Sequence, residues 1–143
     1  MGLAFHPSPG TILMCDFSNG FTPPEMVKKR PVVVISPKRK RCAGLVTVVP
    51  LSTVAPTPVE SFHIRLDSQY LPTLPYFQST ESWVKCDMVY RLGFSRLDLI
   101  KIGKEPSGKR IYFKSSLPDQ VIKCIQGGVL QALQLGYLVE HLR

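Results

Sequence analysis

The chain has 143 residues and a mass of 16.0 kDa, with 44% hydrophobic and 20% charged residues. This composition is typical of one globular domain and excludes a disordered chain. The formal net charge of +8 favours a polyanionic partner. No apolar run reaches the roughly 18–20 residues that cross a bilayer, and the N-terminal residues lack the pattern of a signal peptide. We therefore expect a cytoplasmic protein that is not bound to a membrane.

The four cysteines and three histidines are scattered along the chain. No two cysteines have the C-x-x-C spacing of a zinc site, and the histidines form no cluster with them. We therefore expect reduced thiols and neither a metal nor another cofactor.

The first half of the chain predicts three strands. Residues 10–17 form the first, after a proline-rich arm at residues 1–9, and residues 18–29 form a long loop. Arg30 precedes a proline, which favours extended backbone, so the second strand begins there. The sequence that follows, PVVVIS, is apolar on both faces, as in a central strand buried from both sides. Its expected neighbour is residues 45–50, LVTVVP.

The second half predicts two strands, an insertion, a short helix, a last strand and a long helix. Residues 61–67 and 82–90 have strand patterns, and residues 68–81 between them form an irregular insertion with two prolines. Residues 95–103 have the capping residues of a short helix, and residues 108–115 form the last strand. Helical spacing of apolar residues extends over 118–137. Many short strands with one terminal helix favour a single, mainly β domain that curls into a small barrel.

Positive charge is concentrated around the second strand. Seven of the 18 basic residues lie between positions 28 and 41, on both sides of the apolar run. They are Lys28, Lys29, Arg30, Lys38, Arg39, Lys40 and Arg41. A solvated surface and a site for a polyanion both remain open for this cluster.

Four motifs, taken in order, carry a resemblance to a known family. They are GTILMCDF, the glutamate and arginine of E-x4-RPVVVIS, VVPLST and VKCDMV. With them the chain resembles the PemK/MazF toxins of type II toxin–antitoxin systems over roughly residues 10 to 140. The resemblance implies a homodimeric SH3-like barrel of the plasmid-maintenance-toxin type. It also implies a cognate antitoxin and metal-independent, sequence-specific cleavage of single-stranded RNA, mRNA included, that inhibits growth.

The resemblance also implies site residues. In the family, the arginine of the RP step and a hydroxyl residue after the VP step form the catalytic centre. These correspond to Arg30 and to Ser52, where many relatives have threonine; Thr53 is the alternative hydroxyl. The plasmid-borne branch uses a charged pair that corresponds to Lys85 and Asp87. Asp87 is the candidate general base or base-reading group.

Other charged residues near these motifs are the candidate RNA contacts. Glu25 lies in the loop before Arg30, where it binds bases or orients the guanidinium. Lys28, Lys29 and Lys85 are candidates for phosphate contacts. Some relatives have a histidine just before the loop glutamate; Pro24 is at that position here, so no histidine base is available there.

The residue types suit RNA cleavage by the 2′-hydroxyl. This reaction needs a base for the 2′-hydroxyl, positive charge on the phosphorane oxygens and a proton for the leaving 5′-oxygen. A guanidinium at the end of a buried strand supplies fixed charge in a planar arrangement that fits two phosphoryl oxygens.

Two other functions remain open. A gyrase poison similar to CcdB has the same barrel without nuclease activity, but the C-terminal VEHLR does not resemble the apolar helix end on which that toxin depends. A non-catalytic SH3-like nucleic-acid-binding module is the other. Incubation with a long unstructured RNA separates the three, since only the nuclease produces discrete fragments.

Overall fold

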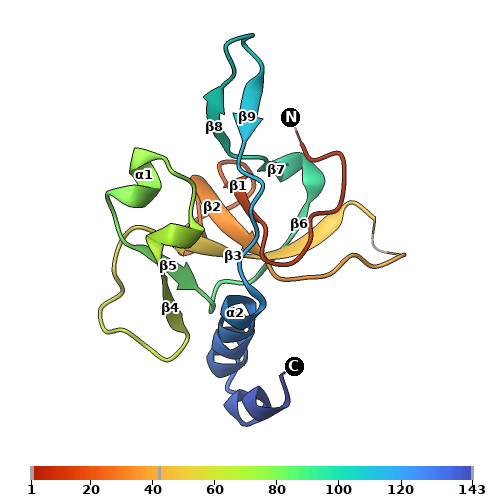
Figure 1. Cartoon of the computed structure of the whole chain (residues 1–143). Coiled ribbons are helices and arrows are strands. Elements are labelled where there is room, and N and C mark those ends of the chain that lie inside the picture. Colours follow the sequence, from red (N-terminus) through yellow and green to blue (C-terminus); the bar gives the residue numbers. More distant parts are fainter. Residues whose placement is uncertain (1, 42, 143) are drawn as a thin grey trace.

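The computed structural model describes residues 2–41 and 43–142. In this part of the chain, seven strands form an antiparallel sheet in the order β4-β5-β3-β2-β1-β7, with β6 also paired to β3. Strands β8 and β9 form a separate hairpin. Figure 1 shows the sheet at the centre, α2 below it and the β8–β9 hairpin projecting on the opposite side. The strands of the sheet are β1 (Ile12–Asp16), β2 (Lys29–Val34), β3 (Leu45–Ser52), β4 (His63–Leu66), β5 (Ser82–Lys85), β6 (Tyr90–Gly93) and β7 (Leu97–Asp98).

The remaining elements are short, apart from α2. They are η1 (Ser68–Tyr70), α1 (Pro75–Gln78), η2 (Phe94–Arg96), β8 (Lys101–Lys104), β9 (Arg110–Tyr112), α2 (Asp119–Ala132) and η3 (Gly136–His141). The mainly β fold class is therefore confirmed. None of the helices in the described residues is both long and apolar enough to cross a membrane.

Strand β2 lies in the middle of the sheet, paired with β1 on one side and β3 on the other. Its Val32, Val33 and Val34 have no exposed surface, which confirms the expectation of burial from both sides. Burying one valine side chain contributes about 1.5–3 kcal/mol. The backbone of β2 is therefore held both by two hydrogen-bonded neighbours and by its own side chains.

Successive side chains of β2 and β3 point to opposite faces of the sheet, and this divides the core into two clusters. One face of the sheet and the helix α2 bury a helix-side core, which includes Val33, Val49, Leu51 and Ile125. The other face buries a barrel core: Leu13, Cys15, Phe17, Val32, Val34, Val46, Val48, Leu92 and Leu97. Because β6 pairs with β3, β7 pairs with β1 and η2 joins them, the sheet curls around this second cluster.

Helix α2 packs on the helix-side core through Ile125, which is completely buried. Gly128 lies against β4 and the turn after β5, since a Cβ there would lie 3.1 Å from Ile64 Cδ1 and 2.7 Å from Cys86 Sγ. The helix ends at Ala132, and Gln134 follows with a φ of 60°. The expected helix over 118–137 is thus too long, because the chain turns there and continues as η3.

The short helix expected at 95–103 is wrong. Those residues form the end of η2, the strand β7 and the start of β8. Leu97 pairs with Cys15 on β1 and is completely buried, so the free edge of β1 determines the conformation here and overrides the capping pattern. The short helix of the fold is α1, within residues 68–81, where we expected irregular structure.

The single strand expected over 82–90 is also wrong, because a turn divides it. The Met88 amide donates to the Lys85 carbonyl at 3.0 Å, and Cys86 and Asp87 lie between them. Strand β5 pairs with β3 at Leu51 and Ser52, whereas β6 pairs with β3 over 45–48. Because of this turn, β5 and β6 both pair with the same edge of β3, at different positions along it.

Candidate functional site

Arg30 lies at the start of β2, at the end of the barrel core. Its Cα partner on β1 is Cys15, a barrel-core residue, so the two side chains lie on the same face of the sheet. The Nε atom of Arg30 is buried, and no described residue forms a hydrogen bond with it. A buried donor left without a partner costs stability, and such cases concentrate at functional sites.

Strands β2 and β3 pair as far as Val32 and Pro50. Arg30 and Ser52 each lie two residues beyond this pair, so an extension of the register places them at the same level. Ser52 is buried, and its Oγ accepts a hydrogen bond from the Val54 amide at 3.1 Å. The contact from Oγ to the Val54 carbonyl is 3.5 Å, too long for a strong hydrogen bond. The hydroxyl proton is therefore available to a ligand.

Thr53 follows the end of β3 and is half-buried. It lies in a bend, so the alternation of strand side chains does not place it on either face of the sheet. Of the two hydroxyl candidates, only Ser52 belongs to β3.

Trp83 lies level with Ser52 on the other side of β3, and sequence reasoning did not select it. Arg65 on β4 follows as its partner, so four strands contribute Arg30, Ser52, Trp83 and Arg65 to one row. Trp83 Nε1 donates to Glu81 at 3.3 Å, and Glu81 forms a salt bridge with Arg65, also at 3.3 Å. The row combines two guanidinium groups, a hydroxyl and an indole.

A cavity of about 490 Å³ lies at the far end of this row. Its lining residues are polar or charged apart from Leu66: Arg65, Asp67, Ser68, Gln78, Ser79, Thr80 and Glu81. Residues of the 68–81 segment form much of the wall. The cavity combines a guanidinium donor with carboxylate acceptors, the groups that read the edges of bases.

Lys85 is the last residue of β5, beyond the row, and Asp87 lies in the turn that follows. Lys85 is half-buried and two residues beyond Trp83, hence on the same face. Asp87 is exposed in the turn, and no hydrogen bond or salt bridge to its carboxylate occurs in residues 2–41 and 43–142. Burial raises the pKa of the neighbouring Cys86 thiol to about 12, with a smaller contribution from Asp87. Cys86 is therefore a neutral packing residue rather than a nucleophile.

The loop at residues 18–28 is fixed to the body of the protein by aromatic packing. The Phe21 and Tyr90 rings both contact Phe17, with centroids 5.3 and 5.0 Å away. The Met26 amide donates to the Tyr90 hydroxyl at 3.0 Å, and the Arg96 guanidinium lies 4.7 Å from the centre of the Phe21 ring. Tyr90 and Arg96 are distant in sequence from the loop, so no local pattern identifies them as its anchors.

The three charged candidates near this loop are exposed. Glu25 Oε1 accepts from the Thr22 amide at 3.2 Å, and none of the described contacts joins it to Arg30. Lys28 and Lys29 extend into solvent, and Lys29 is the Cα partner of Asp16. Hydrogen bonds from the Ser18 hydroxyl and amide lower the pKa of Asp16, and Lys29 and Arg96 lower it further. The residues around the start of β2 thus include both acidic and basic side chains.

No group of three or more His, Cys, Asp or Glu residues in the described ranges is arranged to hold a metal ion. The arrangement at Arg30 offers instead a fixed guanidinium, a hydroxyl donor and exposed lysines. Such groups bind a phosphodiester and stabilise additional negative charge on its oxygens.

Comparison with known proteins gives a family. The family model of the PemK-like, MazF-like toxin of type II toxin–antitoxin systems matches residues 8–127. An uncharacterized protein of Haemophilus influenzae is 29% identical over 144 residues, with 94% of each chain covered.

Solved structures have the same fold. MazF from Deinococcus radiodurans superposes with a TM-score of 0.62 at 18% identity, and the match covers 91% of this chain and 98% of that one. An endoribonuclease from a mycobacterial species, solved in complex with its cognate antitoxin, gives a TM-score of 0.57 at 19% identity, with 91% and 97% covered.

Proposed function

Because the chain belongs to the family of PemK-like, MazF-like toxins of type II toxin–antitoxin systems, we propose that it is a sequence-specific endoribonuclease that cuts single-stranded RNA, mRNA included, in the cytoplasm. The reaction uses the substrate's own 2′-hydroxyl and no metal ion. Growth inhibition follows from the loss of intact messages.

One observation carries the proposal: Arg30 presents a partly buried guanidinium whose Nε has no hydrogen-bond partner in the described chain. The extended register of β2 and β3 brings the Ser52 hydroxyl to its level. A scissile phosphate bound between these two groups accepts hydrogen bonds from the terminal nitrogens of the guanidinium and from the hydroxyl. The backbone of Arg30 is held by β1, so the guanidinium is positioned before the substrate arrives. Preorganised charge of this kind is usually the largest single contribution to lowering a reaction barrier.

The reaction balances without a redox step. A base removes the 2′-hydroxyl proton, and the 2′-oxygen attacks the adjacent phosphorus. Arg30 and Ser52 stabilise the phosphorane oxygens by hydrogen bonds while the bond from phosphorus to the 5′-oxygen breaks. The leaving 5′-oxygen takes up a proton. The products are a 2′,3′-cyclic phosphate and a 5′-hydroxyl end.

The remaining candidates receive separate roles. Asp87 is the proposed base, because its carboxylate is exposed and free of described hydrogen bonds. Lys28, Lys29 and Lys85 contact phosphates on either side of the cut, which positions the RNA without reading its sequence. Bases are read by Glu25 at the loop and by the cavity beyond Trp83, where the RNA strand continues along the row. Thr53 is a secondary hydroxyl that orders the end of β3.

Arg30→Ala tests the central assignment. We expect single-turnover cleavage to fall about 10²–10³-fold, the usual loss when one donor to a developing oxyanion is removed. RNA affinity falls much less, because other basic residues still contact phosphates. The matched control is Arg91→Ala, which removes an exposed arginine from β6. Cleavage by the control stays at the parental rate.

Further results of the same assay test the rest of the mechanism. EDTA leaves the rate unchanged, and the fragments carry 2′,3′-cyclic phosphates. Asp87→Asn slows cleavage by about 10² or more, the contribution typical of a general base. Cleavage by Arg30→Ala at the parental rate, or a requirement for magnesium, refutes the mechanism. If Asp87→Asn cleaves at the parental rate, a residue other than Asp87 is the general base. A chain that never cuts but poisons gyrase, or only shifts RNA mobility, belongs to one of the two other functions.

The proposed partners are a second copy of the chain and an acidic antitoxin. Leu133 and Tyr137, 60% and 71% exposed at the end of α2 and in η3, offer apolar surface for a homodimer. The charge of +8 favours an acidic, disordered antitoxin segment that lies in the RNA site. Light scattering of the free protein and displacement of RNA by the antitoxin check this. A stable monomer, or antitoxin binding that leaves RNA affinity unchanged, contradicts it.

A further inference from the structure

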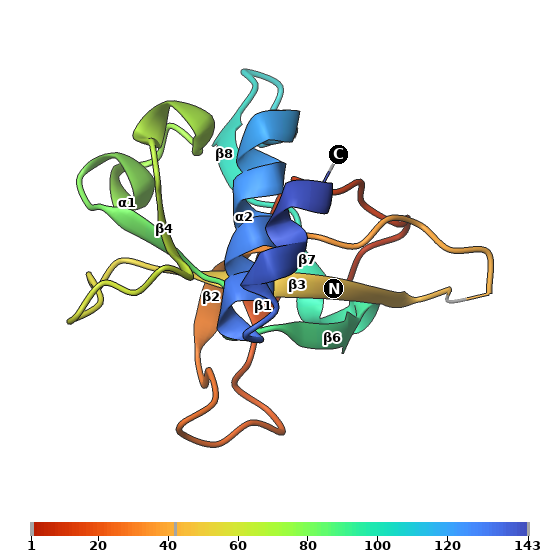
Figure 2. The ribbon, with the colours of Figure 1, turned by 90° about the horizontal axis from the view of Figure 1, so that it is seen from below.

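The basic loop at residues 36–41 and 43–44 lies at the opposite end of β2 from Arg30, and the proposed reaction gives it no role. From Arg30 to Lys38 the chain advances eight residues, at most about 30 Å. Figure 2 shows this hairpin extending from the body in a different direction from the 18–28 loop. A charge run alone is usually a solvated surface. Here, however, three segments of the chain build a groove beside it.

The groove consists of two adjoining cavities. The first, of about 230 Å³, is lined by Lys38, Arg39 and Lys40 from the hairpin, by Phe5 and His6 from the N-terminal arm, and by Phe94. The second, of about 400 Å³, is lined by Phe5 again and by Lys101, Arg110 and Tyr112 of the β8–β9 hairpin. Phe5 lines both cavities, and 56% of its surface is exposed.

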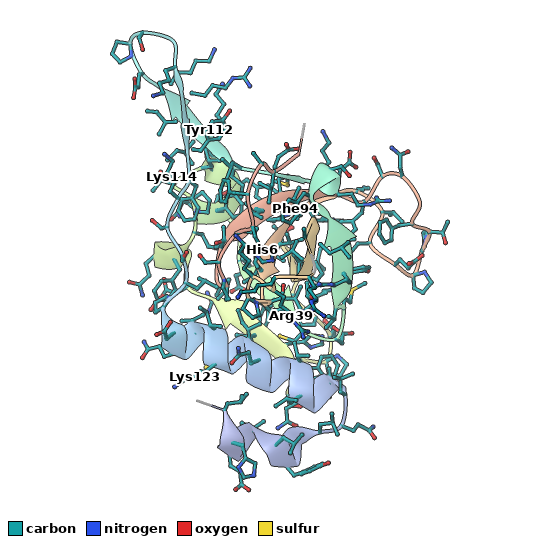
Figure 3. The ribbon with its side chains drawn as sticks, turned by 90° about the vertical axis from the view of Figure 1, so that its right-hand side faces the viewer. His6, Arg39, Phe94, Tyr112, Lys114 and Lys123 are labelled. Carbon is teal, nitrogen blue, oxygen red and sulfur yellow. The ribbon has the colours of Figure 1, made fainter. Side chains whose placement is uncertain are left out.

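Hydrogen bonds tie the walls of the groove together. The Leu3 amide donates to the Phe94 carbonyl at 3.1 Å, and the Phe94 amide donates to the Gly44 carbonyl at 3.0 Å. The His6 ring packs edge-on against Phe94, with centroids 5.7 Å apart. Arm, hairpin and η2 therefore form one preorganised unit. Figure 3 shows His6, Phe94 and Arg39 together on one side of the molecule, with Tyr112 further along.

The charge of the groove is almost entirely positive. Five of its lining side chains are lysines or arginines, and Asp98 is the one acidic residue among the described lining residues. The salt bridges within residues 2–41 and 43–142 involve none of these five cations. Unneutralised cations bind phosphates, and an exposed aromatic ring between two cavities provides a face on which a base stacks.

We propose that this groove binds a second stretch of single-stranded RNA, separate from the stretch at Arg30. Lys38, Arg39 and Lys40 contact phosphates, and Phe5 stacks on a base between the two cavities. The inference rests on the proposed function for its choice of RNA rather than another polyanion. The groove is then a second RNA-binding site, distant from the site of cleavage.

Binding is measured by fluorescence anisotropy over a range of salt concentrations, with an unstructured RNA long enough to reach both places. Its 2′-hydroxyls are methylated, so that cleavage by 2′-hydroxyl attack is impossible. The variants are the triple substitution Lys38→Gln, Arg39→Gln and Lys40→Gln, and the single substitutions Phe5→Ala and Phe5→Trp. The control is Lys104→Gln, Lys109→Gln and Lys123→Gln, which removes the same charge from exposed residues outside both cavities.

We expect the triple variant to lower the slope of log affinity against log salt by about 2, or roughly 0.7 per lost phosphate contact. The control leaves the slope unchanged. Phe5→Ala weakens binding by about 5- to 150-fold, as for the loss of one stacked base, and Phe5→Trp restores it. Because Phe5 is exposed, its substitution tests stacking without disturbing the core.

Equal slopes for the triple variant and the control overturn the proposal, since the loop is then only a solvated surface. A lower slope without an effect of Phe5→Ala also overturns it, since no base then occupies the groove. If polyglutamate, but not RNA, depends on Phe5, the groove is a peptide site. If the protein binds RNA through the groove but never cleaves it, only the proposed function is wrong. If it cleaves RNA and the groove substitutions leave its RNA affinity unchanged, only this inference is wrong.

Discussion

The two ends of the β2–β3 pair both carry positive charge, but in opposite settings. At one end, Arg30 lies within the sheet, its Nε buried and its backbone paired with Cys15. At the other, Lys38, Arg39 and Lys40 are exposed on a loop. The first end fixes a single guanidinium near a buried hydroxyl, whereas the second displays several exposed cations beside aromatic rings.

This difference separates two uses of the same charge. Stabilising a phosphorane requires a donor held in place before the reaction, which a buried strand provides. Holding a flexible polyanion requires only charge density and stacking surfaces, and a loop is sufficient for that. Burial and backbone pairing, rather than the number of cations, therefore distinguish the cleavage end from the binding end.

Ser52 and Thr53 offer the sharpest test of the cleavage end, since they are neighbours with different positions relative to Arg30. A hydrogen bond to a charged group contributes about 1.5–3 kcal/mol, so Ser52→Ala slows single-turnover cleavage by roughly 10- to 150-fold. Thr53→Ala has a much smaller effect, because Thr53 lies beyond the end of β3 and the extended register does not bring it level with Arg30. RNA affinity changes little in either variant.

Ser52→Thr is the matched rescue, because it keeps both the hydroxyl donor and the acceptor for the Val54 amide. We expect it to cleave at nearly the parental rate. If Thr53→Ala loses as much activity as Ser52→Ala, the register-based choice of hydroxyl is wrong, and the end of β3 must rearrange when RNA binds.

The sequence predicts the centre of the fold well and its periphery less well. The two-sided apolar run of β2 is decisive, because few other environments accept Val32, Val33 and Val34 together. The helix predicted at residues 95–103 is wrong, because a capping pattern is only a weak local preference. Pairing of Leu97 with the free edge of β1 is stronger. The turn at Asp87 is likewise set by β3, which accepts two strands along one edge.

The same limit applies to the candidate site. Arg30 and Ser52 are recognisable because each lies at the end of a strong strand pattern. Trp83 requires the pairing of β3 with β5, and Tyr90 and Arg96 require the packing of the 18–28 loop. These contacts join residues far apart in the chain, so no local pattern contains them.

The smallest expected effect on cleavage comes from substitutions in helix α2, which packs against the turn that bears Asp87. Gly127 and Gly128 are adjacent and both buried, but their surroundings differ. A Cβ at Gly127 meets Val139 at 3.7 Å, an ordinary contact. A Cβ at Gly128 lies 2.7 Å from Cys86 Sγ and 3.1 Å from Ile64 Cδ1, so these side chains have to move. Cys86 lies between Lys85 and Asp87, which links this packing to the proposed base.

Gly127→Ala should therefore raise the free energy of unfolding by up to about 1 kcal/mol, the gain in helix propensity. Gly128→Ala should lower it, because overpacking costs about 1–3 kcal/mol and exceeds that gain. Urea denaturation of the two variants measures the difference. At conditions where both are folded, only Gly128→Ala should slow cleavage, by displacing Cys86 and the turn that bears Asp87, while the hairpin groove and its RNA affinity are unaffected. A Gly128→Ala variant as stable as Gly127→Ala would show that Cys86 yields without cost. A destabilised Gly128→Ala that cleaves at the parental rate would mean that the position of Asp87 does not matter, and the cleavage end would then consist of Arg30 and Ser52 without it.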